Sequence, residues 1–90
     1  TLNTLDVMAK AMQLQTTNDT ALLCPMIDAR RMEVFTAVYD YQLNYLLPPT
    51  AIVLTSNFLD TFRKHPEQKI YISGSGASKF MHIMPTNAVE

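Results

Sequence analysis

The first apolar residues of the chain recur every three or four positions, which is the spacing of one buried helix face. They are Leu5, Met8, Ala9 and Met12. Thr4 is a residue type that caps helix N-termini, and Asp6 places a negative charge in the first turn, where the helix dipole favours it. We therefore predict a helix over residues 4–15, followed by a loop over the polar residues 16–20.

A second, longer stretch with helical spacing covers residues 28–47. Asp28 is a suitable cap at its start, and Pro48-Pro49 would end it because proline cannot continue a helix. On a helical wheel one side gathers the apolar residues Val34, Phe35, Val38, Tyr39, Tyr41, Tyr45 and Leu46. Their arc spans roughly 160°, which is wider than a helix needs to cover one sheet face. We therefore predict a helix that contacts two different surfaces.

The short apolar run between these two segments has two interpretations. Ala21 to Cys24 is apolar throughout and is followed by Pro25. Periodicity does not separate a buried strand from helix in so short a run. It is therefore either a brief strand or the lead-in to the second helix.

The chain after the two prolines alternates between strand and helix signals. Thr50–Thr55 is rich in β-branched residues, which predicts a buried strand. Ser56 or Asn57 can cap a short helix that continues to about Lys64. His65-Pro66 would end that helix, because a residue before proline avoids the helical region.

A glycine-containing turn joins the last two predicted strands. Lys69–Ser73 and Ser78–Met84 are the expected strands of a hairpin, and Gly74–Ala77 supplies its flexible turn. Pro85 would end the second strand, and Thr86–Glu90 would form a frayed tail.

Together these elements predict one α+β domain over residues 1–90. It consists of two helices followed by a strand–helix–strand–strand unit with a small antiparallel or mixed sheet. Its core would join the 28–47 helix to Ile52, Leu54, Phe58, Leu59, Phe62, Ile70 and Ile72. A chain of 90 residues has no room for two cores. It begins at Thr1 rather than at methionine, which is consistent with a domain excised from a longer protein.

Composition and charge narrow the class of function. Hydrophobic residues make up 48% of the chain and charged residues 17%, which argues against general disorder. The charged fraction lies below the usual share of about 25%, and this favours an assembled state. The net charge is −1, with −2 on residues 1–47 and +1 on the rest, and this asymmetry is too weak for a nucleic-acid-binding surface, so DNA binding is disfavoured.

Cysteine content and hydropathy bear on the compartment. The single cysteine, Cys24, cannot form an internal disulfide, so we expect a cytoplasmic protein. The uncharged run from Tyr41 to Leu59 is about as long as a membrane span. It contains Pro48-Pro49 and several polar residues, so we expect no membrane association.

The candidate chemical groups favour structural roles. Gly74-Ser75-Gly76 lacks the helix start that a phosphate-binding loop needs, and a turn is the better interpretation. His65 and His82 are far apart, with no second ligand at metal-binding spacing. Cys24 lies in an apolar run and is more typical of a core residue than of a nucleophile. We therefore predict no catalytic residue, cofactor site or metal site, and the sequence favours a binding protein over an enzyme.

The leading hypothesis is a non-enzymatic protein–protein interaction or assembly domain. A tyrosine buries its ring while its hydroxyl keeps a hydrogen bond, so an aromatic row suits a surface that meets a partner. The predicted partner-binding residues are Val38, Tyr41 and Tyr45 on the 28–47 helix, through which we expect self-association.

Two alternatives remain open from the sequence. A short helix followed by a glycine-tipped hairpin resembles the recognition helix and wing of a winged-helix DNA-binding regulator. Only four basic residues are available there for phosphate contacts: Arg63, Lys64, Lys69 and Lys79. The other alternative is a fragment of a larger structural or enzymatic protein.

Overall fold

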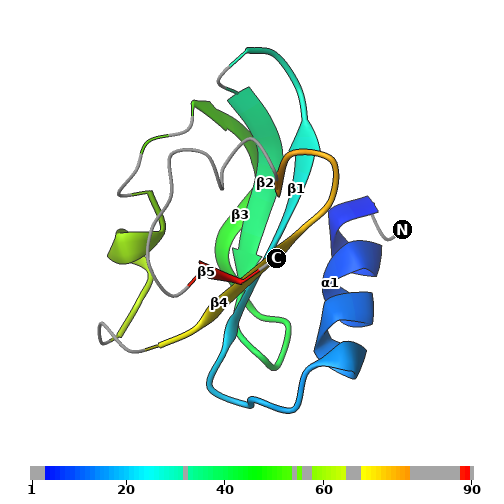
Figure 1. The fold of residues 1–90 in the computed structure, drawn as a ribbon, viewed down its shortest axis with the longest axis vertical. Coiled ribbons are helices and arrows are strands. Elements are labelled where there is room, and N and C mark those ends of the chain that lie inside the picture. The colour runs from blue at the N-terminus through cyan, green and yellow to red at the C-terminus, as the bar shows by residue number, and fades with distance from the viewer. Residues whose placement is uncertain are drawn as a thin grey trace.

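The computed structural model describes residues 4–31, 33–53, 55, 58–64, 68–77 and 88–89. Its elements in chain order are α1 (Thr4–Gln15), β1 (Leu22–Asp28), β2 (Glu33–Tyr39), β3 (Tyr45–Val53), the 3₁₀ helix η1 (Phe58–Thr61), β4 (Ile70–Ser73) and β5 (Ala88–Val89). The five strands form one sheet in the order β3-β2-β1-β4-β5. Figure 1 shows α1 lying along one side of this sheet.

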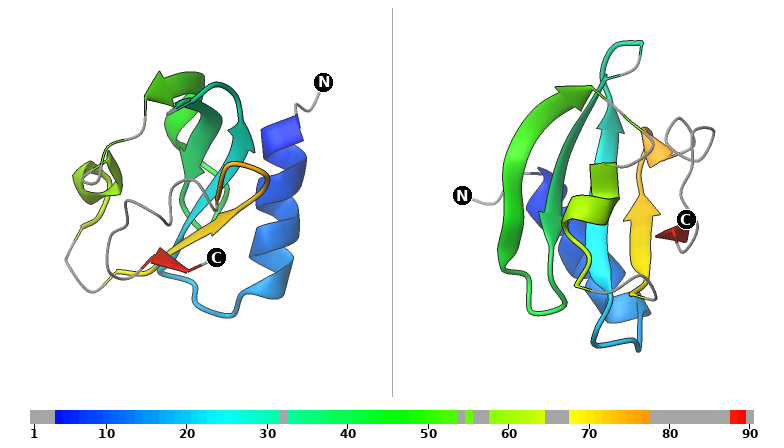
Figure 2. Two further views of the ribbon diagram at one scale, coloured as in Figure 1. Left: turned by 45° about the horizontal axis from the view of Figure 1, so that its top comes forward. Right: turned by 90° about the vertical axis from the view of Figure 1, so that its left-hand side faces the viewer.

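The sheet is mixed. Strands β1, β2 and β3 are antiparallel neighbours, whereas β4 runs parallel to β1 and β5 parallel to β4. The two further views in Figure 2 show α1 on one face of the sheet and η1 on the other. An α+β class with a mixed sheet is therefore confirmed. The second helix of the prediction is not.

The predicted helix over residues 28–47 is wrong. This segment forms the end of β1, the whole of β2 and the first residues of β3. Val34 and Val38 face one hydrophobic cluster, and Ala37 and Tyr39 face the other. A strand buried on both faces has no simple apolar–polar alternation. Its apolar residues therefore also fit helical spacing.

The prediction for residues 4–15 is confirmed. Leu5 and Ala9 of α1 are buried, and they pack with Leu23, Ala37 and Tyr39 of the sheet. The open interpretation of residues 21–24 resolves as strand, because β1 begins at Leu22 and lies between β2 and β4.

Two hydrophobic clusters occupy the two faces of the sheet. The cluster on the α1 face contains Leu5, Ala9, Leu23, Ala37 and Tyr39, and Met8, Met12 and Tyr71 pack against it. The opposite face contains Leu22, Cys24, Met26, Val34, Val38, Ile70, Ile72 and Ala77. Phe58 and Phe62 pack on that second cluster together with Ile52. These contacts are part of the predicted core, although they pack on a sheet and not on a second helix.

A side-chain hydrogen bond joins the proline of an inner strand to the neighbouring strand. Pro25 of β1 has no N–H to donate to a neighbouring strand. The Thr36 hydroxyl of β2 donates to the Pro25 carbonyl over 2.6 Å, and both residues are buried. Leu23 and Met26 on either side keep the register with β2, so the sheet continues past the proline.

The C-terminal predictions had mixed outcomes. The expected strand at residues 50–55 is the second half of β3, and the helix after it is a four-residue 3₁₀ helix, η1. The expected strand over Lys69–Ser73 is confirmed by β4. The strand expected over Ser78–Met84 lies outside the described residues. Thr86–Glu90 is not a frayed tail throughout, because residues 88–89 form β5.

The turn after β4 depends on its glycines. Gly74 has φ of 102°, a left-handed conformation that side-chain-bearing residues rarely adopt. A Cβ atom there would lie 2.2 Å from the Met26 carbonyl oxygen, and one on Gly76 would lie 2.7 Å from a Val34 methyl carbon. The Ser75 hydroxyl accepts a hydrogen bond from the backbone N–H of Asp28 over 2.9 Å. The turn therefore packs tightly against the end of β1.

Candidate interaction surface

The three predicted partner-binding residues do not share a surface. Val38 is fully buried in β2, so it cannot contact a partner in this fold. Tyr41 is half-buried in the β2–β3 turn, and its hydroxyl donates to the Thr16 carbonyl over 3.1 Å. Tyr45, the first residue of β3, is 47% exposed. Of the three, Tyr45 is the one placed best for an external contact.

Tyr45 belongs to a polar cluster that ties α1 to the sheet. The hydroxyls of Tyr39 and Tyr45 both donate to Oδ1 of Asp6, over 2.5 and 2.8 Å. The centres of the two tyrosine rings lie 5.2 Å apart, and the rings are tilted by 46°. Burial, together with the hydrogen bond to the Asp6 carboxylate, raises the pKa of Tyr39 above its ordinary value. The cluster fixes the first turn of α1 over the start of β3.

A cleft of about 370 Å³ lies over this cluster. Its lining is formed by Asp6, Lys10, Tyr39, Leu43 and Tyr45. Leu43 has φ of 68°, an uncommon conformation for a residue with a side chain. The ammonium of Lys10 contacts the Gln13 side-chain oxygen over 3.0 Å. Both tyrosine hydroxyls already donate to Asp6, so we assign this group a role in positioning α1.

The most exposed apolar surface lies along β3. This strand has nine residues and stands at one end of the strand order, so no strand of the described part of the chain pairs with its outer side. Its sequence, YLLPPTAIV, contains no charged residue. Soluble proteins commonly protect long edge strands with charges, prolines or bulges. In β3 the prolines and an irregularity in the pairing are present, but charges are absent.

The prolines divide β3 into two parts. Thr36 pairs with Thr50 and Val38 with Leu47, so Pro48 and Pro49 occupy an irregularity in the ladder. Thr50–Val53 then pairs regularly with residues 33–36 of β2. This second part keeps a backbone N–H at every residue. It is the part of the edge that can accept another strand.

An apolar patch adjoins this regular part. Ile52 packs on the cluster opposite α1, whereas Ala51 and Val53 point to the α1 face, where both are exposed. Val53 is 60% exposed, and Phe35, paired with Ala51, is 38% exposed. The principal contacts of α1 are with β1, β2 and β4. The patch of Phe35, Ala51 and Val53 is therefore a part of this sheet face that α1 leaves exposed.

A second cleft, of about 330 Å³, lies on the other face of the sheet, where the α1–β1 loop meets the segment after η1. Gln68 is buried beside it and donates to the Thr20 carbonyl over 2.8 Å, while its oxygen accepts from the backbone N–H of Lys64 over 2.8 Å. Asp19 and Asp40 line the cleft. The Asp40 carboxylate accepts bonds from the Asn44 backbone and side chain. These bonds hold loops in place.

The candidate chemical residues have structural roles where the structure describes them. Cys24 is buried with its sulfur 3.4 Å from the Thr36 hydroxyl, and burial raises its pKa to about 12. Such a thiol is not an activated nucleophile. His65 and His82 lie outside the described residues. Among the residues that are described, no three histidine, cysteine or acidic side chains gather as metal ligands.

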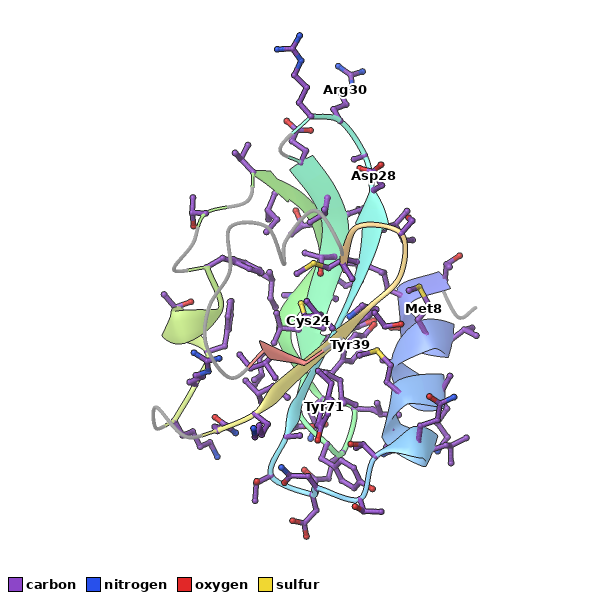
Figure 3. All side chains as sticks on the ribbon, viewed as in Figure 1. Met8, Cys24, Asp28, Arg30, Tyr39 and Tyr71 are labelled. Carbon is purple, nitrogen blue, oxygen red and sulfur yellow. The ribbon has the colours of Figure 1, made fainter. Side chains whose placement is uncertain are left out.

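The basic residues do not form one surface. Arg30 and Arg31 lie in the β1–β2 connection, from which Arg30 projects in Figure 3. The connection from η1 to β4 carries Arg63, Lys64 and Lys69 at the opposite end of the sheet, because β4 starts beside the first residue of β1. The described residues therefore place no basic stripe beside a recognition helix. The segment expected to contain that helix is η1, which is one short turn.

No family model, no curated protein and no solved structure matches this chain. Within the described ranges, no helix is long and apolar enough to cross a membrane.

Proposed function

We propose that this chain is a protein-interaction domain that binds an extended protein segment along the outer edge of β3. One observation carries the proposal: exposed apolar side chains are concentrated at this edge. In the described part of the chain, the large apolar side chains that are exposed are Val7, Leu14, Phe35, Tyr45, Leu46 and Val53. Three of these six belong to β3, and Phe35 lies next to it on β2.

Strand addition explains how such an edge would bind. The outer backbone groups of Thr50–Val53 would form the ladder with the partner, which supplies affinity with little dependence on sequence. Phe35 and Val53 would contact alternate side chains of the added segment on the α1 face, which supplies selectivity. Tyr45 and Leu46 extend the apolar edge beyond the prolines.

The partner that best fits is uncharged and extended. A charged side chain placed against Phe35 or Val53 would lose water without gaining an opposite charge from β3. Residues with β-branched or aromatic side chains suit both the ladder and the patch.

Selection from a displayed library of random peptides tests this function. We expect the selected peptides to be uncharged, rich in β-branched or aromatic residues, and to bind at least about tenfold more weakly to Val53→Lys. The matched control is Val7→Lys, which adds the same charge at a valine of similar exposure, 55% against 60%, on α1. Binders that ignore Val53→Lys, or are weakened equally by Val7→Lys, would contradict the proposal.

A further inference from the structure

We propose that the segment received by β3 is β3 of a second copy of this chain, paired antiparallel along Thr50–Val53. This inference rests on the proposed function of the β3 edge and names its partner. The pairing would join two sheets into one continuous sheet about a two-fold axis perpendicular to it.

Charge is the first argument for a second copy. In a two-fold pairing each residue meets a residue of the same strand, so any charge on β3 would face a like charge nearby. The strand Tyr45–Val53 has none. The net charge of the whole chain is only −1, so repulsion between copies is small. An uncharged edge is therefore complementary to itself.

Backbone hydrogen bonding limits the pairing to one part of the strand. Pro48 and Pro49 offer no donor, and the ladder to β2 is irregular beside them. Thr50–Val53 is regular, and each of its residues has an N–H. Centring the axis on Ile52 pairs Ala51 of each copy with Val53 of the other and leaves the prolines of both copies outside the new ladder.

The apolar patch supports the same arrangement. An axis perpendicular to the sheet keeps the α1 faces of both copies on one side. Ala51 of each copy would then lie opposite Val53 of the other across the new ladder, and the two patches would form one continuous apolar surface. An antiparallel pairing thus gives the exposed Val53 of each copy an apolar neighbour across the new ladder.

The size of the contact predicts a weak dimer. A ladder this short and its few cross-strand side-chain contacts bury less than the roughly 1,200 Å² that mark the lower limit of stable interfaces. We therefore expect monomers at about 10 µM and a measurable dimer fraction as the concentration approaches about 1 mM.

Sedimentation equilibrium over this concentration range tests the inference. We expect the mass-average molar mass of the wild type to rise with concentration, and that of Val53→Lys to remain at the monomer value. Val7→Lys should associate like the wild type, because Val7 lies on α1. Circular dichroism of each variant shows whether it is folded, and both valines are exposed enough for lysine to remain hydrated.

Amide hydrogen exchange identifies the contact if Val53→Lys also disturbs the fold. We expect exchange of the wild type to slow with rising concentration at those amides of Thr50–Val53 that point away from β2. A wild type that stays monomeric near 1 mM would overturn the inference, and so would association without added protection of these amides. If the selected peptides still bind at β3 in either case, the proposed function stands and only the second copy is excluded.

Discussion

The hydroxyl of Tyr45, the first residue of the edge strand, donates a 2.8 Å hydrogen bond to Asp6 in the first turn of α1. Thirty-nine positions separate the two residues in sequence. The bond joins the N-terminal helix to the outermost strand, and Tyr39 strengthens the link by donating to the same oxygen. The edge strand is thus anchored at its start, while Thr50–Val53 keeps its outer side available.

Removing the Tyr39 hydroxyl should destabilise the fold more than removing that of Tyr45. Tyr39 is 2% exposed and its bond to the carboxylate is the shorter of the two. We expect Tyr39→Phe to cost about 1.5–3 kcal/mol, as for hydrogen bonds to charged groups, and Tyr45→Phe less than about 1 kcal/mol. Urea unfolding measures both. Equal costs would show that the cluster does not hold α1 as described.

Stability should fall at alkaline pH. The folded protein raises the pKa of Tyr39 by burial and by its bond to Asp6, so the unfolded chain loses this proton first, near pH 10. The stability that the neutral hydroxyl provides is complete below about pH 10 and is lost as the pH rises further. The decline in stability begins above about pH 9 because burial raises the pKa of the Cys24 thiol from 9.0 to about 12. The unfolded chain therefore loses this thiol proton before the folded protein does.

Urea unfolding at several pH values above neutrality measures this decline. Above about pH 10, the unfolding free energy of Tyr39→Phe should fall less steeply with pH than that of the wild type. The variant lacks the hydroxyl whose ionisation is coupled to unfolding. An unchanged slope would contradict the assignment to Tyr39.

Thr36→Val should destabilise the protein by about 1–3 kcal/mol, because the Pro25 carbonyl would lose its buried donor. Thr50→Val is the matched control. The Thr50 hydroxyl makes only a 3.5 Å contact with the adjacent Ala51 carbonyl, so we expect a change within about 0.5 kcal/mol. Chemical denaturation compares the two. A small cost at Thr36 would mean that the sheet tolerates Pro25 without this bond.

Gly74→Ala should cost at least about 1–3 kcal/mol, since alanine is strained at φ of 102° and its Cβ would overlap the Met26 carbonyl. Ser75→Ala in the same turn should cost only about 0.5–1.5 kcal/mol, because it removes one exposed bond to the Asp28 backbone. The thermal midpoints of the two variants give the comparison. A reversed order would mean that the turn can move away from β1.

Sequence patterns identified the elements whose local signal is unambiguous. Thr4, Asp6 and the spaced apolar residues define α1, and Ile70 and Ile72 identify β4. The packing of Phe58 and Phe62 near Ile70 and Ile72 was also predictable from their spacing. Each of these signals comes from a few adjacent residues and needs no knowledge of the rest of the fold.

The segment from residue 28 to 47 was not predictable from the same signals. β2 is buried on both faces, so its apolar residues lack strand alternation. Asp40 and Asn44, four positions apart, lie on the polar side of a helical wheel, but in the structure they bond to each other across a turn. Leu43 takes the left-handed conformation there without glycine as a signal.

The candidate surface was predictable only in part. Tyr45 was expected at a partner-binding surface and is exposed, and its role there stays a prediction. Val38 was placed on the same surface because a helical wheel sets it beside Tyr41 and Tyr45, whereas β2 turns it into the core. Val53 and Phe35 were missed, because exposure of a sheet edge depends on strand order. The absence of charge across residues 41–59 was the available signal.

Backbone amide shifts on dilution test the central claim most directly. In ¹⁵N–¹H spectra recorded between about 1 mM and about 10 µM, we expect the largest changes at Thr50–Val53 and at Phe35. The amides around Val7 and Leu14, also exposed apolar positions, should stay constant. Shifts that concentrate on α1, or spectra that do not depend on concentration, would contradict an association through β3.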